Sequence, residues 1–176
     1  MGKKPVLILL TCFFVFSFAK VRPTTKEKIN WLTIEELNLK LNQEPRPVFI
    51  DLYTDWCYWC KVMDKKTYNN PKVTAYINDH FYALKLNAET KDNIKWNSKE
   101  YKFNVSNKVN DFALYITNGQ MEFPTMVIFP DVQKVPASIP GFMDPKEIEP
   151  ILKYFGEGKY NTQNYEEFSK TFKKTW

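Results

Sequence analysis

Blocks of apolar residues, separated by polar and proline-containing turns, predict the strands of a buried sheet. Segment 48–53 is nearly continuously apolar, which is typical of a central strand covered on both faces, and 81–86 is a second buried strand. A third strand is expected over 124–129, paired as a hairpin with about 134–139. These strands form the centre of the predicted fold.

Helix signals lie around and between these strands. Thr33 and Glu36 have the spacing of a capping box and open a helix that Pro45 and Pro47 end. Further helices are expected over 57–68, 71–78, 107–118, 145–155 and 165–172. After the first helix the order is β-α-α-β-α-β-β-α, which predicts an α/β fold with a mixed central sheet and helices on both faces.

One internal segment has no clear period. Residues 91–106 are polar with spaced aromatic side chains, Trp96, Tyr101 and Phe103. The favoured interpretation is an insertion that covers a face of the sheet, because most loops carry no specific contact. The alternative is a rim in which these three aromatic side chains select the substrate.

The first residues have the pattern of a secretory leader. A basic start precedes an uncharged stretch, Val6–Ala19, and Ser17 and Ala19 are the small residues expected before a cleavage point. The stretch is shorter than the roughly 20 residues of a membrane span. We therefore expect a signal peptide over 1–19 and a periplasmic or secreted chain. An uncleaved N-terminal anchor is the alternative, and acylation of Cys12 is a weaker one.

The rest of the 176-residue chain is short enough for one domain. It divides into a polar lead-in over 20–32, a body over 33–156 and a C-terminal helical extension over 157–176. The body carries the insertion at about 89–120. No internal repeat or long linker divides it further.

Charge and motifs narrow the range of partners. The formal charge of +5 falls by two when Lys3 and Lys4 of the leader are removed. What remains is too weak and dispersed for nucleic-acid binding. Neither a GxGxxG nor a P-loop motif occurs, so no nucleotide cofactor is expected. We expect a monomer without a cofactor.

Removal of the leader leaves two cysteines, Cys57 and Cys60, where a strand turns into a helix. The amides and dipole of a helix N-terminus favour a thiolate on the first cysteine, and the second lies one turn further in. This context favours a redox pair that switches between dithiol and disulfide. The alternatives are half of a zinc site with His80, or an inert disulfide that closes a short loop.

Residues around this pair resemble those of thioredoxin-fold proteins. The resemblance covers about 33–155, and four groups of residues carry it: Asp51-Leu52-Tyr53-Thr54-Asp55-Trp56-Cys57, Lys85-Leu86-Asn87, Phe123-Pro124-Thr125 and Gly141. Within this fold the chain is most similar to secreted bacterial thioredoxin-like proteins of the Bacteroidetes type. It is also similar to the periplasmic C-terminal domain of the disulfide reductase DsbD.

The resemblance implies roles for individual residues. Cys57 would be the nucleophile and Cys60 the resolving cysteine, while a buried Asp51 paired with Lys85 would handle the proton of Cys60. Pro124 would be a cis-proline that faces the cysteines. The substrate would be bound by Trp56, Tyr58, Trp59, Phe123, Pro124 and Thr125.

The function so implied is an extracytoplasmic thiol-disulfide oxidoreductase that acts on protein disulfides and uses a membrane or soluble thiol redox partner. A reductase is favoured over an oxidase. The alternatives are a non-catalytic thioredoxin-fold binding module and a metal chaperone that uses the two thiolates. No metal site is expected.

Two departures from the compact members of the family stand out. The residues between the cysteines are Tyr58-Trp59, where cytosolic thioredoxin has Gly-Pro, so the direction of electron flow cannot be transferred. The distance in sequence from Cys57 to Pro124 is also longer than in compact members, and the insertion accounts for the surplus.

Overall fold

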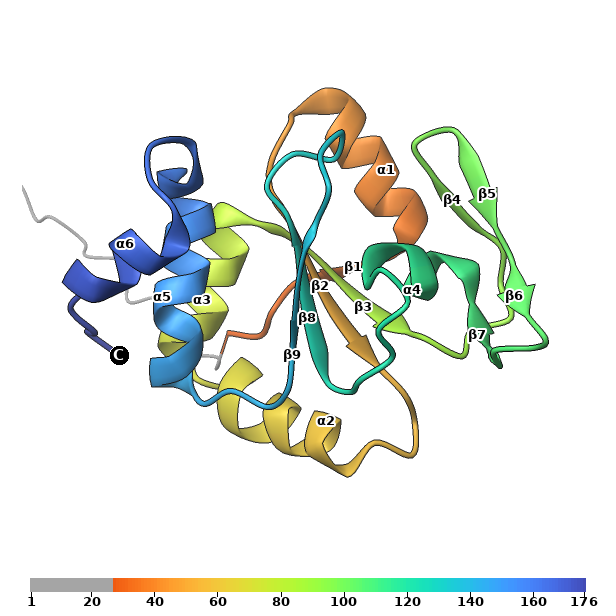
Figure 1. Ribbon diagram of the computed structural model, residues 1–176, viewed down its shortest axis with the longest axis horizontal. Coiled ribbons are helices and arrows are strands. Elements are labelled where there is room, and N and C mark those ends of the chain that lie inside the picture. Colours follow the sequence, from red (N-terminus) through yellow and green to blue (C-terminus); the bar gives the residue numbers. More distant parts are fainter. Residues whose placement is uncertain (1–26) are drawn as a thin grey trace, which may run out of the picture.

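The computed structural model describes residues 27–176, so the predicted signal peptide and Cys12 lie outside the described residues. A five-stranded sheet forms its centre, with strand order β1-β3-β2-β8-β9 (Figure 1). The strands are β1 (Trp31–Leu32), β2 (Val48–Tyr53), β3 (Tyr82–Asn87), β8 (Thr125–Phe129) and β9 (Ala137–Pro140). The β3 strand runs parallel to β1 and β2, whereas β8 is antiparallel to β2 and β9. The predicted mixed sheet is confirmed.

Helices cover both faces of this sheet because neighbouring residues of each strand point to opposite sides. Ile50 and Leu52 of β2 belong to one buried cluster, and Phe49 belongs to the other. The first cluster packs against α1 (Ile34–Gln43) and α4 (Asp111–Ile116). The second packs against α2 (Tyr58–Met63), the π-helical turn η1 (Asp64–Tyr68), α3 (Pro71–His80) and α5 (Pro145–Gly156).

Helix ends follow local capping chemistry. Thr33 and Glu36 form the expected capping box of α1. Asp144 makes a second capping box at the start of α5, with Pro145 in the first turn. The helix expected over 107–118 is shorter, because Asn110 lies in a strand and its side chain caps α4. The helix expected over 57–68 changes to π-helical geometry after Met63.

The insertion forms two small hairpins and α4 rather than an irregular loop. The hairpins pair β4 (Ile94–Trp96) with β5 (Lys99–Tyr101), and β6 (Phe103–Asn104) with β7 (Val109–Asn110). Trp96 and Tyr101 are only 1% and 5% exposed and pack against the first cluster. The insertion therefore covers a face of the sheet. The alternative of a substrate-selecting aromatic rim is wrong for Trp96 and Tyr101, because both side chains are buried in the core.

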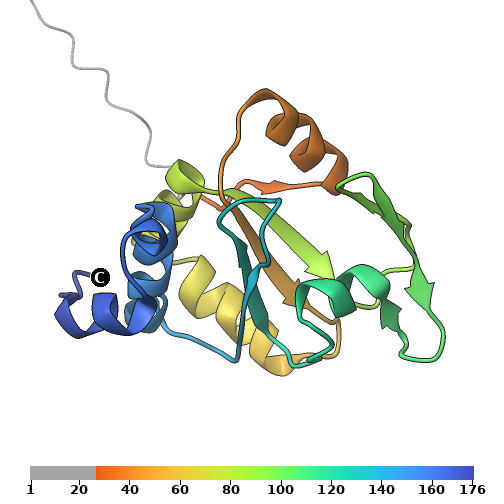
Figure 2. The same cartoon turned by 45° about the horizontal axis from the view of Figure 1, so that its top comes forward.

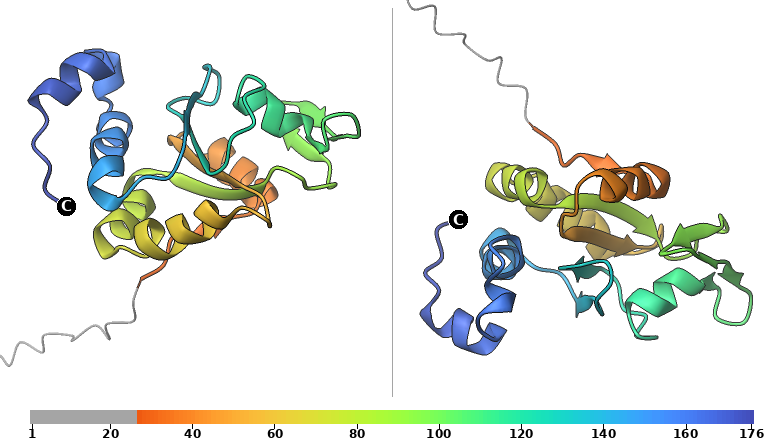
Figure 3. Two further views of the ribbon diagram at one scale, coloured as in Figure 1. Left: turned by 60° about the horizontal axis from the view of Figure 1, so that its bottom comes forward. Right: turned by 90° about the horizontal axis from the view of Figure 1, so that it is seen from above.

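The C-terminal extension packs at the other end of the molecule from the insertion (Figures 2 and 3). It contains a short 3-10 turn (Lys159–Asn161) and α6 (Tyr165–Thr171). The last residues return to α5, where the buried carboxylate of Glu149 accepts hydrogen bonds from the backbone amides of Thr175 and Trp176. Lys153 forms an ion pair with the same carboxylate at 3.0 Å.

Glu149 should hold this tail in place. Burial alone would raise the pKa of Glu149, but the hydrogen bonds from Thr175, Lys153 and Trp176 hold it below its ordinary value. We expect Glu149→Gln to lower the free energy of unfolding by about 1.5–3 kcal/mol at neutral pH. Because the pKa is lowered in the folded state, the wild-type advantage should disappear as the pH falls through that pKa.

Urea denaturation between pH 3 and 7 measures this difference. Glu157→Gln is the matched control, since Glu157 is the exposed C-cap residue of the same helix and its ion pair with Lys159 spans 3.8 Å. That change should cost less than about 0.5 kcal/mol. Equal effects of the two substitutions would show that Glu149 does not anchor the tail.

Candidate active site

Cys57 and Cys60 form a disulfide where β2 leads into α2. Cys57 is the N-cap residue of α2, and its Sγ accepts a hydrogen bond from the backbone amide of Cys60 at 3.0 Å. The predicted position of the pair between strand and helix is confirmed. Both residues are buried, at 5% and 3% exposure, so little of the disulfide is accessible at the surrounding surface.

That surface is unusually aromatic. Trp56, Tyr58 and Trp59 are 67%, 69% and 54% exposed, although large apolar side chains are normally buried. Their positions are nevertheless defined by contacts: the indole of Trp56 donates to a carboxylate oxygen of Glu89 at 2.9 Å, and Trp59 packs against Phe142 with ring centroids 5.5 Å apart. An exposed apolar patch of this kind is typical of a binding surface.

The loop before β8 completes this surface. The peptide bond between Phe123 and Pro124 is cis, and the carbonyl of Pro124 accepts a hydrogen bond from Gly141 at 2.8 Å. Phe123 meets the ring of Trp56 edge to face, with centroids 5.8 Å apart. A shallow hollow of about 230 Å³ lies between Trp59, Phe123, Pro124, Gly141 and Phe142.

Thr125 takes a different place from the other predicted substrate contacts. Its side chain is 1% exposed, and its hydroxyl donates to the carbonyl of Glu122 at 2.6 Å. The hydroxyl is therefore used inside the fold and does not line the hollow. Phe142, which the sequence analysis did not single out, lines it instead.

Asp51 and Lys85 are neighbours across β2 and β3, and Lys85 donates a hydrogen bond to Asp51. Asp51 is 1% exposed, and Tyr68 also donates to its carboxylate at 3.3 Å. Burial raises the pKa of Asp51, and the ammonium group of Lys85 opposes that rise only in part. A buried carboxyl group with a raised pKa can accept and release a proton near neutral pH.

A second carboxylate shares the lysine. Asp64 accepts from Lys85 at 2.6 Å and is partly exposed, so Lys85 bridges a buried and a solvent-facing acid. Burial by itself lowers the pKa of Lys85, but the two carboxylates raise it above its ordinary value. The lysine therefore stays charged.

Three aromatic rings surround the same ammonium group. Its Nζ lies 4.8 Å from the ring centre of Tyr53, 5.4 Å from Trp31 and 5.8 Å from Tyr68. Cation–π contacts add to the two ion pairs and fix the side chain of Lys85. Asp64 could have been found in the sequence, since it lies one helical turn after Cys60. Trp31 could not have been found in this way, because β1 has only two residues and its partner strand, β3, lies about 50 residues later in the sequence.

Cys60 and Asp51 lie on the same side of the sheet. Cys60 and Met63 are the buried residues of α2, and Met63 belongs to the cluster that includes Phe49. Asp51 follows Phe49 by two residues on β2, so both side chains point to that face. The arrangement combines a disulfide, a buried carboxyl group on the same side of the sheet and a patch of exposed aromatic side chains.

Comparisons with known proteins agree with this geometry. The thiol:disulfide interchange protein DsbD of Pectobacterium atrosepticum is 30% identical over 125 residues, which cover 69% of this chain and 18% of that protein. DsbD of Salmonella typhi is 31% identical over 116 residues, covering 64% of this chain and 17% of that protein. The chain thus spans less than a fifth of the length of these relatives.

Solved structures share the fold. A thioredoxin-fold protein from Helicobacter pylori has a TM-score of 0.56 at 22% identity, over 71% of this chain and 78% of that one. A DsbH oxidoreductase has a TM-score of 0.54 at 15% identity, over 80% and 92%. A family model described as Thioredox_DsbH, protein of unknown function DUF255, matches residues 18–167. The chain therefore belongs to this thioredoxin-like DsbH family.

Proposed function

We propose that the chain is an extracytoplasmic thiol-disulfide oxidoreductase that reduces disulfides in proteins. The observation that carries this proposal is the Cys57–Cys60 disulfide at the start of α2, next to exposed aromatic side chains and above a buried acid. An inert disulfide would need neither the exposed aromatics nor the acid, and a four-residue loop stabilises a fold only slightly.

The reaction proceeds in two exchange steps. In the dithiol form, the Cys57 thiolate attacks one sulfur of the substrate disulfide, which forms a mixed disulfide and releases the other substrate sulfur as a thiolate. Cys60 then gives its proton to Asp51 and attacks Cys57 Sγ. The second substrate sulfur leaves as a thiolate, and the Cys57–Cys60 disulfide forms again. A thiol redox partner, membrane-bound or soluble, must return two electrons before the next turnover.

The substrate lies across the aromatic surface. An extended segment fits along the Phe123–Pro124 loop beside Trp56, where backbone groups can pair with it as an added strand would. The hollow beside Trp59 has a volume of about 230 Å³ and an apolar wall, so it accommodates an apolar side chain near the substrate disulfide. Tyr58, which is 69% exposed, extends the surface further.

The charges under the site favour the reducing direction. When both are ionised, Asp51 and Asp64 carry more negative charge than Lys85 neutralises, and negative charge nearby disfavours a thiolate. A destabilised thiolate makes the disulfide form relatively more favourable, which lowers the reduction potential of the pair. We expect a potential nearer that of thioredoxin, about −270 mV, than that of DsbA, about −120 mV.

Two measurements test the proposal. The dithiol form should reduce insulin and be turned over when a chemical reductant regenerates it, and equilibration with glutathione gives the reduction potential. Binding of insulin without reduction would indicate a binding module instead. Tight stoichiometric uptake of copper with no reductase activity would indicate a metal chaperone.

The location is a separate part of the proposal. Among residues 27–176, no helix is long and apolar enough to cross a membrane. We propose cleavage after Ala19 and release into the periplasm or medium. Mass spectrometry of the exported protein should find Lys20 at the N-terminus. An intact Met1, or a lipid on Cys12, would contradict cleavage and favour an anchored chain.

The hydrogen bond between Trp56 and Glu89 should matter for protein substrates more than for chemistry. We expect Trp56→Phe to raise KM for insulin about threefold to tenfold while turnover of a small disulfide stays unchanged, because an unfixed ring binds a large partner less well. Glu89→Gln is the matched variant, since its amide oxygen can still accept from the indole. A Glu89→Gln variant as impaired as Glu89→Ala would show that charge, not the hydrogen bond, is responsible.

A further inference from the structure

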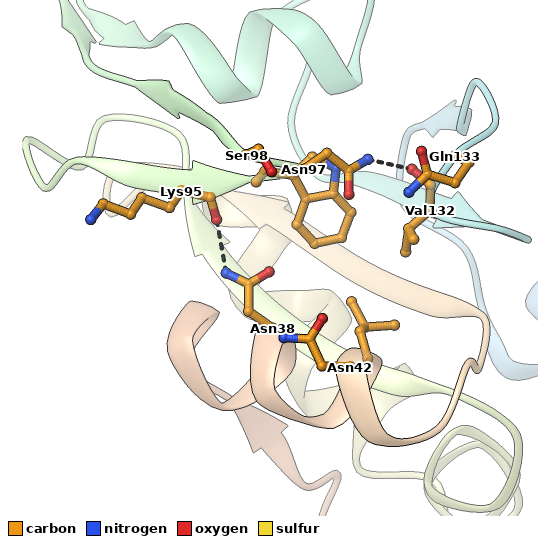
Figure 4. Close-up of a pocket in the computed structure, with 9 residues that line it drawn as sticks. Asn38, Asn42, Lys95, Asn97, Ser98, Val132 and Gln133 are labelled. Atoms are coloured by element: carbon orange, nitrogen blue, oxygen red, sulfur yellow. Dashed lines mark hydrogen bonds between the residues drawn. The ribbon is translucent and has the colours of Figure 1, made fainter.

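A second pocket lies at the end of the sheet opposite to the disulfide. It has a volume of about 500 Å³ and is enclosed by α1, the turn between β4 and β5, and the loop after β8. Side-chain amides dominate its lining: Asn38, Asn42, Asn97 and Gln133, with the hydroxyl of Ser98 beside them. Figure 4 shows Asn38 and Asn42 reaching from α1 toward the residues of the other two walls.

The inside of this pocket carries no charged side chain. Among residues 27–176, Lys95 is the only charged residue that lines it, and Figure 4 shows its side chain pointing away while its carbonyl faces Asn38. The pocket therefore favours an uncharged group that both donates and accepts hydrogen bonds, because carboxamides do both.

Two hydrogen bonds fix the walls relative to one another. The amide nitrogen of Asn38 donates to the carbonyl of Lys95 at 2.9 Å, which joins α1 to β4. The amide nitrogen of Asn97 donates to the carbonyl of Val132 at 2.6 Å, which joins the hairpin turn to the loop after β8. The carbonyl oxygens of both side chains are left to accept from a ligand, and the pocket is formed in advance.

Two other features of the pocket lower the stability of the fold and are not explained by folding requirements. Asparagine is a poor helix former, yet Asn38 and Asn42 are spaced four residues apart on one face of α1. The indole N–H of Trp96, which also lines the pocket, is buried and has no hydrogen-bond partner within residues 27–176.

The pocket continues into a second hollow. Leu41, Val132 and Gln133 line both spaces, and the second, of about 650 Å³, extends over apolar and charged residues: Pro45, Arg46, Pro47, Pro130, Asp131, Lys134 and Tyr160. Together they form one groove, with side-chain amides at one end and a mixture of apolar and charged residues at the other. A long ligand with repeating amide groups and varied side chains matches this sequence of surfaces.

We propose that this groove binds an extended polypeptide segment, with the amide pocket holding its uncharged backbone groups. A saccharide would share the hydrogen-bonding chemistry, but sugar binding favours an exposed aromatic ring as a platform, and the ring that lines the amide pocket, Trp96, is only 1% exposed. The groove lies at the start of β2, whereas Cys57 lies beyond the other end of this strand. A segment bound in the groove therefore leaves the disulfide accessible.

The test uses the full mature chain labelled with ¹⁵N and a mixture of blocked, cysteine-free hexapeptides made of uncharged residues. We expect saturable shifts of the side-chain amide signals of Asn38, Asn42, Asn97 and Gln133. The double variant Asn42→Ala and Gln133→Ala should weaken binding at least tenfold, and turnover of a small disulfide should not change. Gln43→Ala is the matched control, because Gln43 is the next residue on α1 and lies outside the pocket.

Three results would overturn the proposal. No shift of these signals with the peptides would remove the site. Shifts that the double variant does not weaken would place binding elsewhere. Saturable shifts with maltotriose but none with the peptides would identify a saccharide site instead. None of these outcomes depends on the redox activity of Cys57 and Cys60.

Discussion

The Cys60→Ser variant should accumulate as a stable mixed disulfide between Cys57 and its protein substrates, with steady-state reduction lower by about 10³-fold or more. Cys57 can still attack the substrate, because its position as the N-cap residue of α2 does not depend on Cys60. Resolution fails because a serine hydroxyl does not displace a thiolate from sulfur under these conditions. The substitution is nearly isosteric, and losing a four-residue disulfide loop costs little stability.

The matched control is Cys57→Ser. It should be equally inactive but trap nothing, since the nucleophile at the N-cap of α2 is absent and Cys60 lies inside the helix. Non-reducing gels of both variants after incubation with oxidised insulin or a periplasmic extract, followed by mass spectrometry of the adducts, compare them directly. Equal trapping by both variants would mean that the roles of Cys57 and Cys60 are assigned wrongly.

Much of the fold follows from signals that are local in the sequence. The capping boxes at Thr33 and Asp144 place the starts of two helices, and the apolar run 48–53 places the central strand. The short strand β1 has no such local signal, since its two residues form a strand only through pairing with β3. The turn of the β4–β5 hairpin has no such signal either, because Asn97 and Ser98 adopt left-handed backbone conformations there and no glycine marks the turn.

The same division applies to the site. Cys57 and Cys60 follow from motif spacing, whereas Asp51 and Lys85 follow from the resemblance to thioredoxin-fold proteins, and the pairing of β2 with β3 brings these two together. The partners Glu89, Tyr68 and Phe142 come from separate elements and carry no motif. Their roles depend on tertiary packing, which local sequence patterns do not encode. Burial of Trp96 follows equally from packing, because the aromatic spacing alone fits both a core and a rim.

Asp51→Asn should preserve the first exchange step and slow the second by about 10²-fold at neutral pH, the usual contribution of a positioned base. Attack by Cys57 needs no base once its thiolate is present at the helix start. Resolution needs one, because Cys60 is buried and must lose its proton first. An amide accepts no proton, so mixed disulfide should accumulate, and the rate of the second step should recover at higher pH where Cys60 ionises unaided.

The same substitution should also make the protein more stable. Burial raises the pKa of Asp51, so the folded protein binds this proton more tightly than the unfolded chain does. Wild-type stability therefore falls as pH rises through the folded-state pKa of Asp51, and the asparagine variant lacks this loss. Lys85 keeps Asp64 as a partner at 2.6 Å. We expect a gain of about 1 kcal/mol or more at neutral pH, which shrinks toward zero below the ordinary pKa of an aspartate.

Stopped-flow fluorescence separates the two exchange steps, and urea denaturation across pH gives the stability. The two readouts distinguish a proton acceptor from a structural ion-pair partner, because only a proton acceptor links a slow second step to rescue by alkaline pH. Asp64→Asn is the control: its carboxylate contacts the same lysine but is partly exposed, so the second step should change much less. Equal slowing of both steps by Asp51→Asn, or no recovery at high pH, would restrict Asp51 to holding Lys85 in place.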